Sequence, residues 1–182
     1  MYKFGKRLAA LALAAVVAMS SSVFASSVIN SPVSGTTNDS NSTVSGKAIS
    51  TNQDTDIAKA QSKTDTLVIA SIVKKDTRTF KVTRINTGAV SGKKYKQIKI
   101  FCRSNVKFKK QVIKGKSKKS KKLIITIASG QKKLKAANFD KKAFKGFKGQ
   151  IIIKKKAMSK KQFNKLKAKL RKGGFKGKIT RK

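Results

Sequence analysis

The sequence predicts an α+β fold that is rich in β-structure. We expect a short solenoid of stacked repeat units, with a β-hairpin at its N-terminal end and a capping helix at its C-terminal end. Three observations predict it: β-branched segments alternate with charged residues, an apolar frame ending in glycine occurs three times, and a helical apolar stripe follows the last copy. The folded domain is expected to span residues 66–182.

The hairpin is predicted at residues 66–85. Its first strand is the β-branched segment TLVIASIV, which ends at the polar loop KKDTR. In the second strand, TFKVTRI, Phe80 and Val82 alternate with Lys81 and Thr83. This alternation indicates one buried face and one solvated face.

The glycine-ended frame occurs in INTGAVSG (85–92), FKKQVIKG (108–115) and FDKKAFKG (139–146). The three glycines are 23 and 31 residues apart. The first spacing falls within the period of leucine-rich repeats, about 20–29 residues. We therefore expect residues 85–157 to form a leucine-rich-repeat-like solenoid, whose apolar frame residues fill the space between neighbouring coils.

A strand is expected after each frame, in YKQIKIF (95–101), LIITI (123–127) and QIIIK (150–154). Because side chains alternate across a strand, Ile98 and Ile100 should face the core while Lys99 faces solvent.

The capping helix is predicted over residues 159–172. Its apolar residues recur at helical spacing: Phe163, Leu166 and Leu170. Ser159 suits the start of this helix and Gly173 its end. FKGKIT, residues 175–180, is expected to add a final short strand.

The N-terminal part has a different composition. Residues 1–25 have the basic start, the apolar run and the small-residue cleavage site of a secretory signal peptide, with an uncleaved anchor as the alternative. Residues 26–65 are rich in Ser, Thr, Asn and Gly, and we expect a disordered polar leader there. Since no later stretch approaches the roughly 20 apolar residues of a transmembrane helix, we expect no span after signal cleavage. The expected location is secreted or extracellular, including attachment to the cell surface by charge.

Charge is the strongest functional signal. The chain has 46 basic residues, 6 acidic residues and a formal net charge of +40. All but six of the basic residues lie from Lys74 onward, where Asp76 and Asp140 are the only acids. Such a surface attracts polyanions, although a lysine cluster can also be a solvated face without a ligand. The candidate residues for anionic-ligand binding are Lys99, Lys118, Lys119, Lys121, Lys122, Lys154, Lys155 and Lys156.

Catalysis, cofactors and metals are not expected. The chain has no His, few acids and one Cys, so it offers no evident acid–base pair and no set of metal ligands. Cys102 is interpreted as a small apolar residue near a strand end, with intermolecular pairing as the alternative.

Residues 143–182 resemble the closing segment of BspA-type leucine-rich-repeat surface proteins of Firmicutes. The shared pattern is Ala-Phe-x-Gly, a lysine-flanked strand, an amphipathic Lys/Leu helix, and a Lys-Gly turn before a short strand. TLVIASIVKKDTRTFKVTRI and SGKKYKQIKI resemble the hairpin and first repeat of that family, so the resemblance covers Thr66–Lys182. The chain departs from the family at Lys93, Lys116 and Phe147, where the family often has Cys. The resemblance implies a secreted or surface-exposed protein without enzymatic activity, used in adhesion or ligand binding.

The expected function is a non-catalytic binding or adhesion module of the bacterial cell surface. Expected partners are anionic cell-wall or host polymers and host or bacterial surface proteins, with incidental binding of nucleic acid. Two alternatives stay open: a basic protein dedicated to nucleic acid, and a membrane-active protein that uses its cationic helix. The sequence leaves the oligomeric state open.

Overall fold

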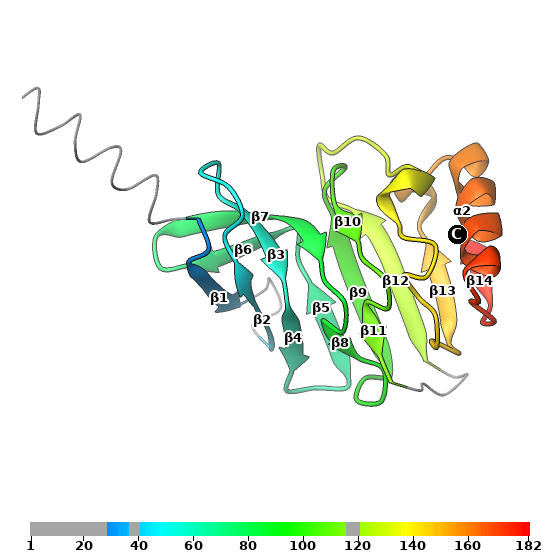
Figure 1. Cartoon of the computed structure of the whole chain (residues 1–182), viewed down its shortest axis with the longest axis horizontal. Helices are drawn as coiled ribbons and strands as arrows, with labels where there is room; N and C mark the ends of the chain where they lie inside the picture. The colour runs from blue at the N-terminus through cyan, green and yellow to red at the C-terminus, as the bar shows by residue number, and fades with distance from the viewer. Residues whose placement is uncertain (1–28, 37–40, 116–120) are drawn as a thin grey trace, which may run out of the picture.

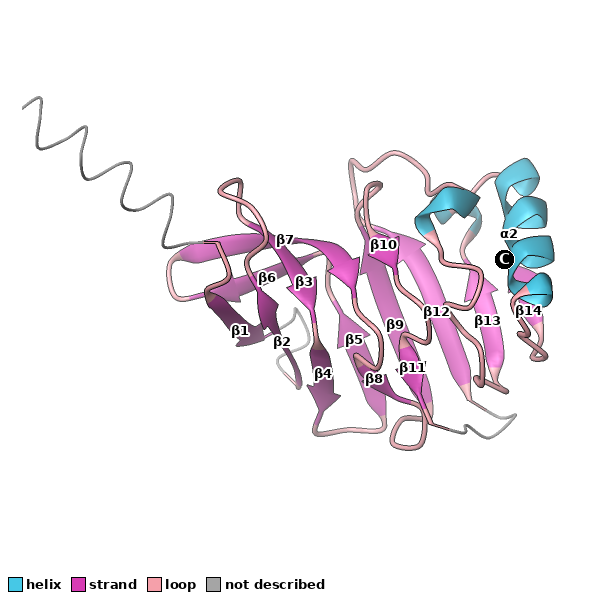
Figure 2. Ribbon diagram, in the orientation of Figure 1, coloured by secondary structure: helices cyan, strands magenta, loops and turns pink. Residues whose placement is uncertain are grey.

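The computed structural model describes residues 29–36, 41–115 and 121–182. The signal peptide expected at residues 1–25 lies outside these ranges. The described residues are rich in β-structure and contain one α-helix, α2 (Lys160–Lys172), together with the short 3-10 helices η1 (Ala136–Asn138) and η2 (Lys155–Ala157) (Figure 1; Figure 2). Their strands form a seven-stranded mixed sheet, a five-stranded parallel sheet and a two-stranded parallel sheet.

The mixed sheet is built mainly from the N-terminal half of the chain. Its order is β10-β7-β6-β1-β2-β4, and β3 also pairs with β7. Successive strands from β7 to β4 are antiparallel, whereas β3 and β10 run parallel to β7. The strands are β1 (Pro32–Thr36), β2 (Ser42–Lys47), β3 (Asp54–Ile57), β4 (Lys59–Ser62), β6 (Ile72–Lys75), β7 (Arg78–Ile85) and β10 (Lys107–Phe108).

The prediction of a disordered leader at residues 26–65 is wrong for the described part of that segment, which supplies β1 to β4. Small apolar residues such as Val44 and Ala60 are buried there, and so are the polar residues Ser42 and Thr55. The polar residues find partners: the Ser42 hydroxyl accepts a hydrogen bond from the Val68 backbone N–H at 3.0 Å. Since paired polar groups can be buried at little cost, these strands need few large apolar residues.

The parallel sheet has the order β14-β13-β12-β9-β5. Side chains in register form apolar rows on its inner face, one of which joins Leu67, Ile98, Leu123, Ile151 and Ile179. Every residue of this row is buried. The strands are β5 (Thr66–Ile69), β9 (Gln97–Cys102), β12 (Lys122–Ile127), β13 (Gln150–Ile153) and β14 (Ile179–Arg181), and the separate pair is β8 (Val90–Ser91) with β11 (Ile113–Lys114).

The large apolar residues that open the three glycine-ended frames lie in line with one another. Ile85 pairs with Phe108 between β7 and β10, and Phe108 forms a parallel bridge with Phe139. The rings of Phe108 and Phe139 are stacked, with centroids 4.4 Å apart and planes inclined by 10°. Phe144 meets Phe108 edge-on at 5.9 Å. These frame residues are therefore core residues, which explains why they recur in a chain so rich in lysine.

The predicted leucine-rich-repeat-like solenoid with one N-terminal hairpin is nevertheless wrong. Of the described residues, 44% are in strands and 13% are helical, and they form a β-rich fold with one mixed sheet, two parallel sheets and a single α-helix. The hairpin expected at residues 66–85 divides: β5 joins the parallel sheet beside β9, and only β6 pairs with β7. The physical reason is that β7 takes additional partners, β3 and β10, from segments outside the predicted hairpin.

Helix α2 lies beside the C-terminal strand β14 (Figure 1). Ser159 is its N-cap, and the side chain accepts a hydrogen bond from the Gln162 backbone N–H at 3.3 Å. Its apolar stripe is buried: Phe163, Leu166 and Leu170. Gly173, the C-cap, lies so close to Lys141 that an added Cβ would come within 1.7 Å of the Lys141 carbonyl oxygen. The helix end therefore requires glycine at this position because of close packing.

Candidate functional site

The outer face of the parallel sheet carries the candidate site. Side chains alternate along each strand, so the residues between the buried Ile98, Ile100 and Cys102 of β9 point outward. Lys99 is partly exposed and Phe101 is exposed. Strand register places Lys99 beside Ile124 of β12, and Phe101 beside Thr126. Basic and apolar side chains therefore lie next to each other on this face.

These side chains line a groove of about 650 Å³. Lys154 continues the row of Phe101 and Thr126, because Ile153 pairs with Ile125 and the Lys154 backbone N–H donates to the Ile125 carbonyl at 2.9 Å. Lys182 is held at the groove by the parallel ladder, since its backbone N–H donates to the Ile153 carbonyl at 3.0 Å. The lining residues are Lys99, Phe101, Ile124, Thr126, Lys154, Lys155, Lys156 and Lys182.

The charged side chains that line the groove are of one sign. Five of the eight lining residues are lysines, and none is acidic. Among the described residues, the one ion pair joins Lys96 to Asp65 at 2.5 Å, and neither residue lines the groove. No ion pair or side-chain hydrogen bond joins the groove ammonium groups to the rest of the described chain. Mutual repulsion of these ammonium groups favours occupation of the groove by an anion.

Two uncharged residues of the groove are unusual. Phe101 is 40% exposed, and Ile29 is the other large apolar side chain exposed to this extent in the described chain. Thr126 is only 7% exposed, and its Oγ1 has no hydrogen-bond partner among the described residues. An unpaired buried hydroxyl is unfavourable, so neither residue is explained by packing alone.

The structure brings together half of the lysines that the sequence suggested. Lys99, Lys154, Lys155 and Lys156 all line the groove. Lys122 is exposed at the start of β12, beside Gln97 and Gln150 rather than in the groove. Lys118 and Lys119 lie outside the described residues.

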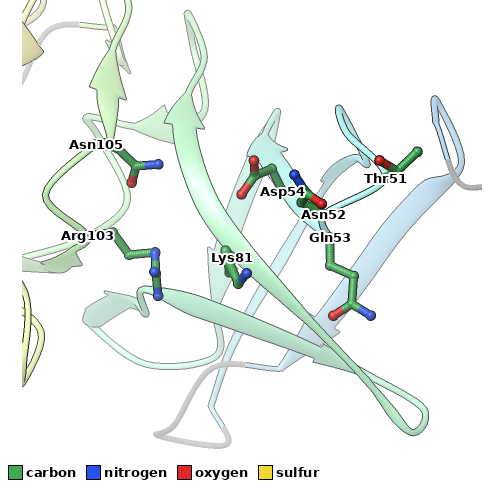
Figure 3. Close-up of a pocket in the computed structure, with 7 residues that line it drawn as sticks. All are labelled: Thr51, Asn52, Gln53, Asp54, Lys81, Arg103 and Asn105. Carbon is green, nitrogen blue, oxygen red and sulfur yellow. The ribbon is translucent and has the colours of Figure 1, made fainter.

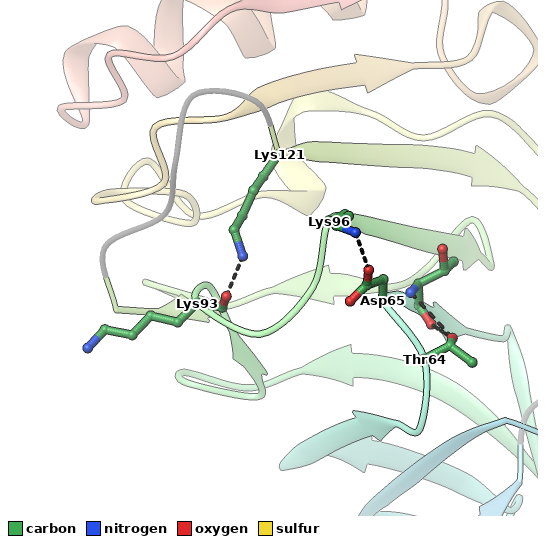
Figure 4. Close-up of polar contacts among 6 residues, drawn as sticks. Thr64, Asp65, Lys93, Lys96 and Lys121 are labelled. Atoms are coloured by element: carbon green, nitrogen blue, oxygen red, sulfur yellow. Dashed lines mark hydrogen bonds and ion pairs between the residues drawn. The ribbon is translucent and has the colours of Figure 1, made fainter.

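Lys121 differs from the other candidates, because it is only 8% exposed. Its ammonium group donates a hydrogen bond to the Lys93 carbonyl oxygen (Figure 4). In the same region the carboxylate of Asp65 raises the pKa of the exposed Lys96 through a hydrogen bond and charge attraction. Lys121 thus joins two segments of the fold, and little of it is exposed to a ligand.

Sequence reasoning missed Phe101, Ile124, Thr126 and Lys182 as lining residues. The alternation in YKQIKIF already puts Phe101 on the face of Lys99. Ile124 and Thr126 could be added only from the register between β9 and β12, which the sequence does not contain.

A second, polar pocket of about 440 Å³ lies between the N-terminal sheet and the turn after β9 (Figure 3). Arg103 enters it from that turn and Lys81 from β7, while Asp54 comes from the segment opposite. Two hydrogen bonds hold this turn in place: the Asn138 side-chain amide donates to the carbonyl oxygens of Ser104 at 3.0 Å and Val106 at 2.7 Å. This pocket mixes both signs of charge, so it is a weaker candidate for a polyanion than the groove.

Cys102 is buried at the end of β9, and its burial raises the pKa of the thiol. The described residues contain no cluster of His, Cys, Asp and Glu that could hold a metal ion. Within the same ranges, none of the helical segments has the length and apolarity needed to cross a bilayer.

Comparisons with protein-family models, with curated proteins and with solved structures gave no match for this chain.

Proposed function

We propose that the chain is a secreted, non-catalytic binding or adhesion module of the bacterial cell surface, which holds anionic polymers in the outer groove of the parallel sheet. One observation carries the proposal: five lysines converge on a groove whose lining residues include no Asp or Glu. One lies within β9, one follows β13, one follows β14 and two belong to η2. An extended anion that enters the groove relieves the repulsion among these lysines.

Lysine suits this kind of binding. Its ammonium group is a point charge on a flexible stem and does not select a planar, bidentate partner as arginine does. Attraction should therefore depend on charge density and salt more than on one geometry. At 0.1 M salt, charges separated by more than about 10 Å are largely screened, so the clustered lysines should dominate binding at physiological ionic strength.

The test is a titration of the full mature chain with a fluorescent polyanion, such as polyglutamate, at several salt concentrations. One variant replaces Lys99, Lys154, Lys155 and Lys156 by Gln. The matched control makes the same change at four exposed lysines of α2: Lys160, Lys161, Lys165 and Lys167.

The groove variant should bind more weakly than the control. Its affinity should also fall less steeply as salt rises, because each lysine that no longer pairs with an anionic group of the polymer releases fewer counterions on binding. Equal affinities and slopes for the two variants would mean that net charge alone attracts the polymer, which would overturn the proposal.

The two alternatives have less support. The apolar stripe of α2 is buried against the domain, so the helix presents no apolar face for insertion into lipid. Single-stranded nucleic acid prefers several exposed rings on which successive bases stack, whereas Phe101 is the one exposed Phe or Tyr ring in the described chain.

A further inference from the structure

We infer that the ligand of the groove is an acidic polysaccharide: one sugar ring stacks on Phe101, and the acid groups on neighbouring sugars contact the lysines. This inference rests on the proposed function and deepens it from anionic polymers in general to one chemical class. Attraction between charges gives no reason for an exposed aromatic ring among the lysines, and Phe101 is such a ring.

Phe101 lies between cations. Lys99 precedes it by two residues on the same face of β9, and the row that starts at Phe101 passes through Thr126 to Lys154. Neighbouring strands are about 4.8 Å apart, so the backbones at Phe101 and Lys154 are separated by roughly 10 Å. The groove therefore matches a polymer that places sugar rings between successive acid groups.

The apolar floor points to the same class. Ile124 lies between β9 and β13 and is partly exposed beside Lys99. A chain of phosphates has no apolar face to place on Phe101 and Ile124, and polyglutamate offers only flexible side-chain methylene groups. The C–H face of a pyranose ring does, and it gains dispersion contacts with an aromatic ring.

Thr126 supplies a hydrogen-bonding group beside Phe101. Its Oγ1 is covered in this structure and has no partner among the described residues. Exposed side chains change rotamer rapidly, so the neighbouring Phe101 and lysine side chains can move to admit a ligand. A sugar hydroxyl is both donor and acceptor and can pair with the Thr126 hydroxyl in either direction.

The groove also contains no arginine and one aromatic ring. Arginine provides bidentate recognition of phosphate and of base edges, and a nucleic-acid strand gains from rings placed in succession. The observations therefore favour a glycan over a nucleic acid.

The experiment compares four probes on the full mature chain at one salt concentration: polygalacturonate, polyglutamate, polyphosphate and oligo(dT). Polygalacturonate and polyglutamate each carry one carboxylate per unit, and only the first has sugar rings. We expect tighter binding of polygalacturonate than of polyglutamate. Phe101→Ala should reduce affinity for polygalacturonate by about tenfold, the scale of one aromatic contact, and leave polyglutamate and polyphosphate unchanged.

Ile29→Ala is the matched control, because Ile29 is exposed to a similar extent, 44%, and lies away from the groove. It should leave all four affinities unchanged. Phe101→Tyr keeps the ring and should retain the preference for polygalacturonate. Thermal unfolding of each variant shows whether the fold is intact.

Three results would overturn the glycan inference while the proposed function stands: no preference for polygalacturonate over polyglutamate, an equal loss for every probe in Phe101→Ala, or a ring-dependent preference for oligo(dT). If the groove-lysine variant binds every probe as well as the helix-lysine control, the proposed function itself fails.

Discussion

Thr126→Val should make the protein more stable. Most substitutions in a packed sheet are destabilising, so this one is expected to be an exception. Thr126 is 7% exposed, and its hydroxyl has no partner among the described residues. Valine keeps the β-branched shape and replaces the unpaired hydroxyl by a methyl group. Removing an unsatisfied buried group is worth about 1–3 kcal/mol, of which we expect roughly 1–2 kcal/mol because the site borders an open groove.

Thr55→Val is the matched control. Thr55 is fully buried in β3, and its single hydroxyl proton is shared between the carbonyl oxygens of Lys47 at 3.0 Å and Asp56 at 3.1 Å. The same substitution there removes satisfied hydrogen bonds and should cost about 1–2 kcal/mol. The two variants should therefore shift stability in opposite directions.

Urea unfolding followed by circular dichroism measures both effects. For a domain of this size, 1 kcal/mol corresponds to a change in Tm of about 2–4 °C. The urea dependence of the unfolding free energy should be unchanged, since neither variant alters the surface exposed on unfolding. If Thr126→Val destabilises the fold as Thr55→Val does, the Thr126 hydroxyl has a structural partner and its assignment to the ligand is refuted.

Two further predictions concern the core. Phe139→Ala removes a ring that is 1% exposed and stacked on Phe108 at 4.4 Å, so the unfolding free energy measured in urea should fall by about 3–5 kcal/mol; a decrease near that of the exposed Phe101→Ala would contradict the stacked core. Burial raises the pKa of the Cys102 thiol, which keeps it protonated in the native state, so iodoacetamide should react with native protein far more slowly than with unfolded protein. The unfolded thiol ionises near pH 8.5, so burial of the neutral thiol leaves stability unchanged below that pH and lowers it as the pH rises further. If a Cys102→Ala variant loses as much stability as the parent over this pH range, the thiol does not cause the loss.

The C-terminal half of the fold could be predicted where local pattern decides the structure. The spacing of Phe163, Leu166 and Leu170 with a serine before them is sufficient for α2, because helical bonds are local. The alternation in β9 gives its buried and exposed faces for the same reason. The frame residues Phe108 and Phe139 were also assigned to packing, and they stack on each other.

The strands β1 to β4 could not be predicted in this way. They bury mainly small apolar and hydroxyl side chains, so their composition is similar to that of a disordered segment. Their stability comes from pairing with residues distant in sequence, such as Ser42 with Val68. Long-range pairing also explains why the segment predicted as one strand forms two, β5 and β6. β5 pairs with β9 and β6 pairs with β7, and these partners are not evident from the local sequence.

The candidate site shows the same division. Alternation along β9 and the lysine run after β13 identified Lys99 and Lys154 to Lys156. The register between strands was needed to place Phe101, Thr126 and Lys154 in one row. The charge of Lys121 predicts an exposed position, whereas the residue is 8% exposed and its ammonium group donates to the Lys93 carbonyl.

The common direction of β5, β9, β12, β13 and β14 has a consequence for how the molecule can vary. All five carboxyl ends lie at one edge, where the segment after β13 supplies Lys154 to Lys156. Lys154 to Lys156 are exposed, so these three positions can be recoded while the isoleucine rows beneath keep their pairing. A library restricted to them would vary the charge of the groove on a constant scaffold.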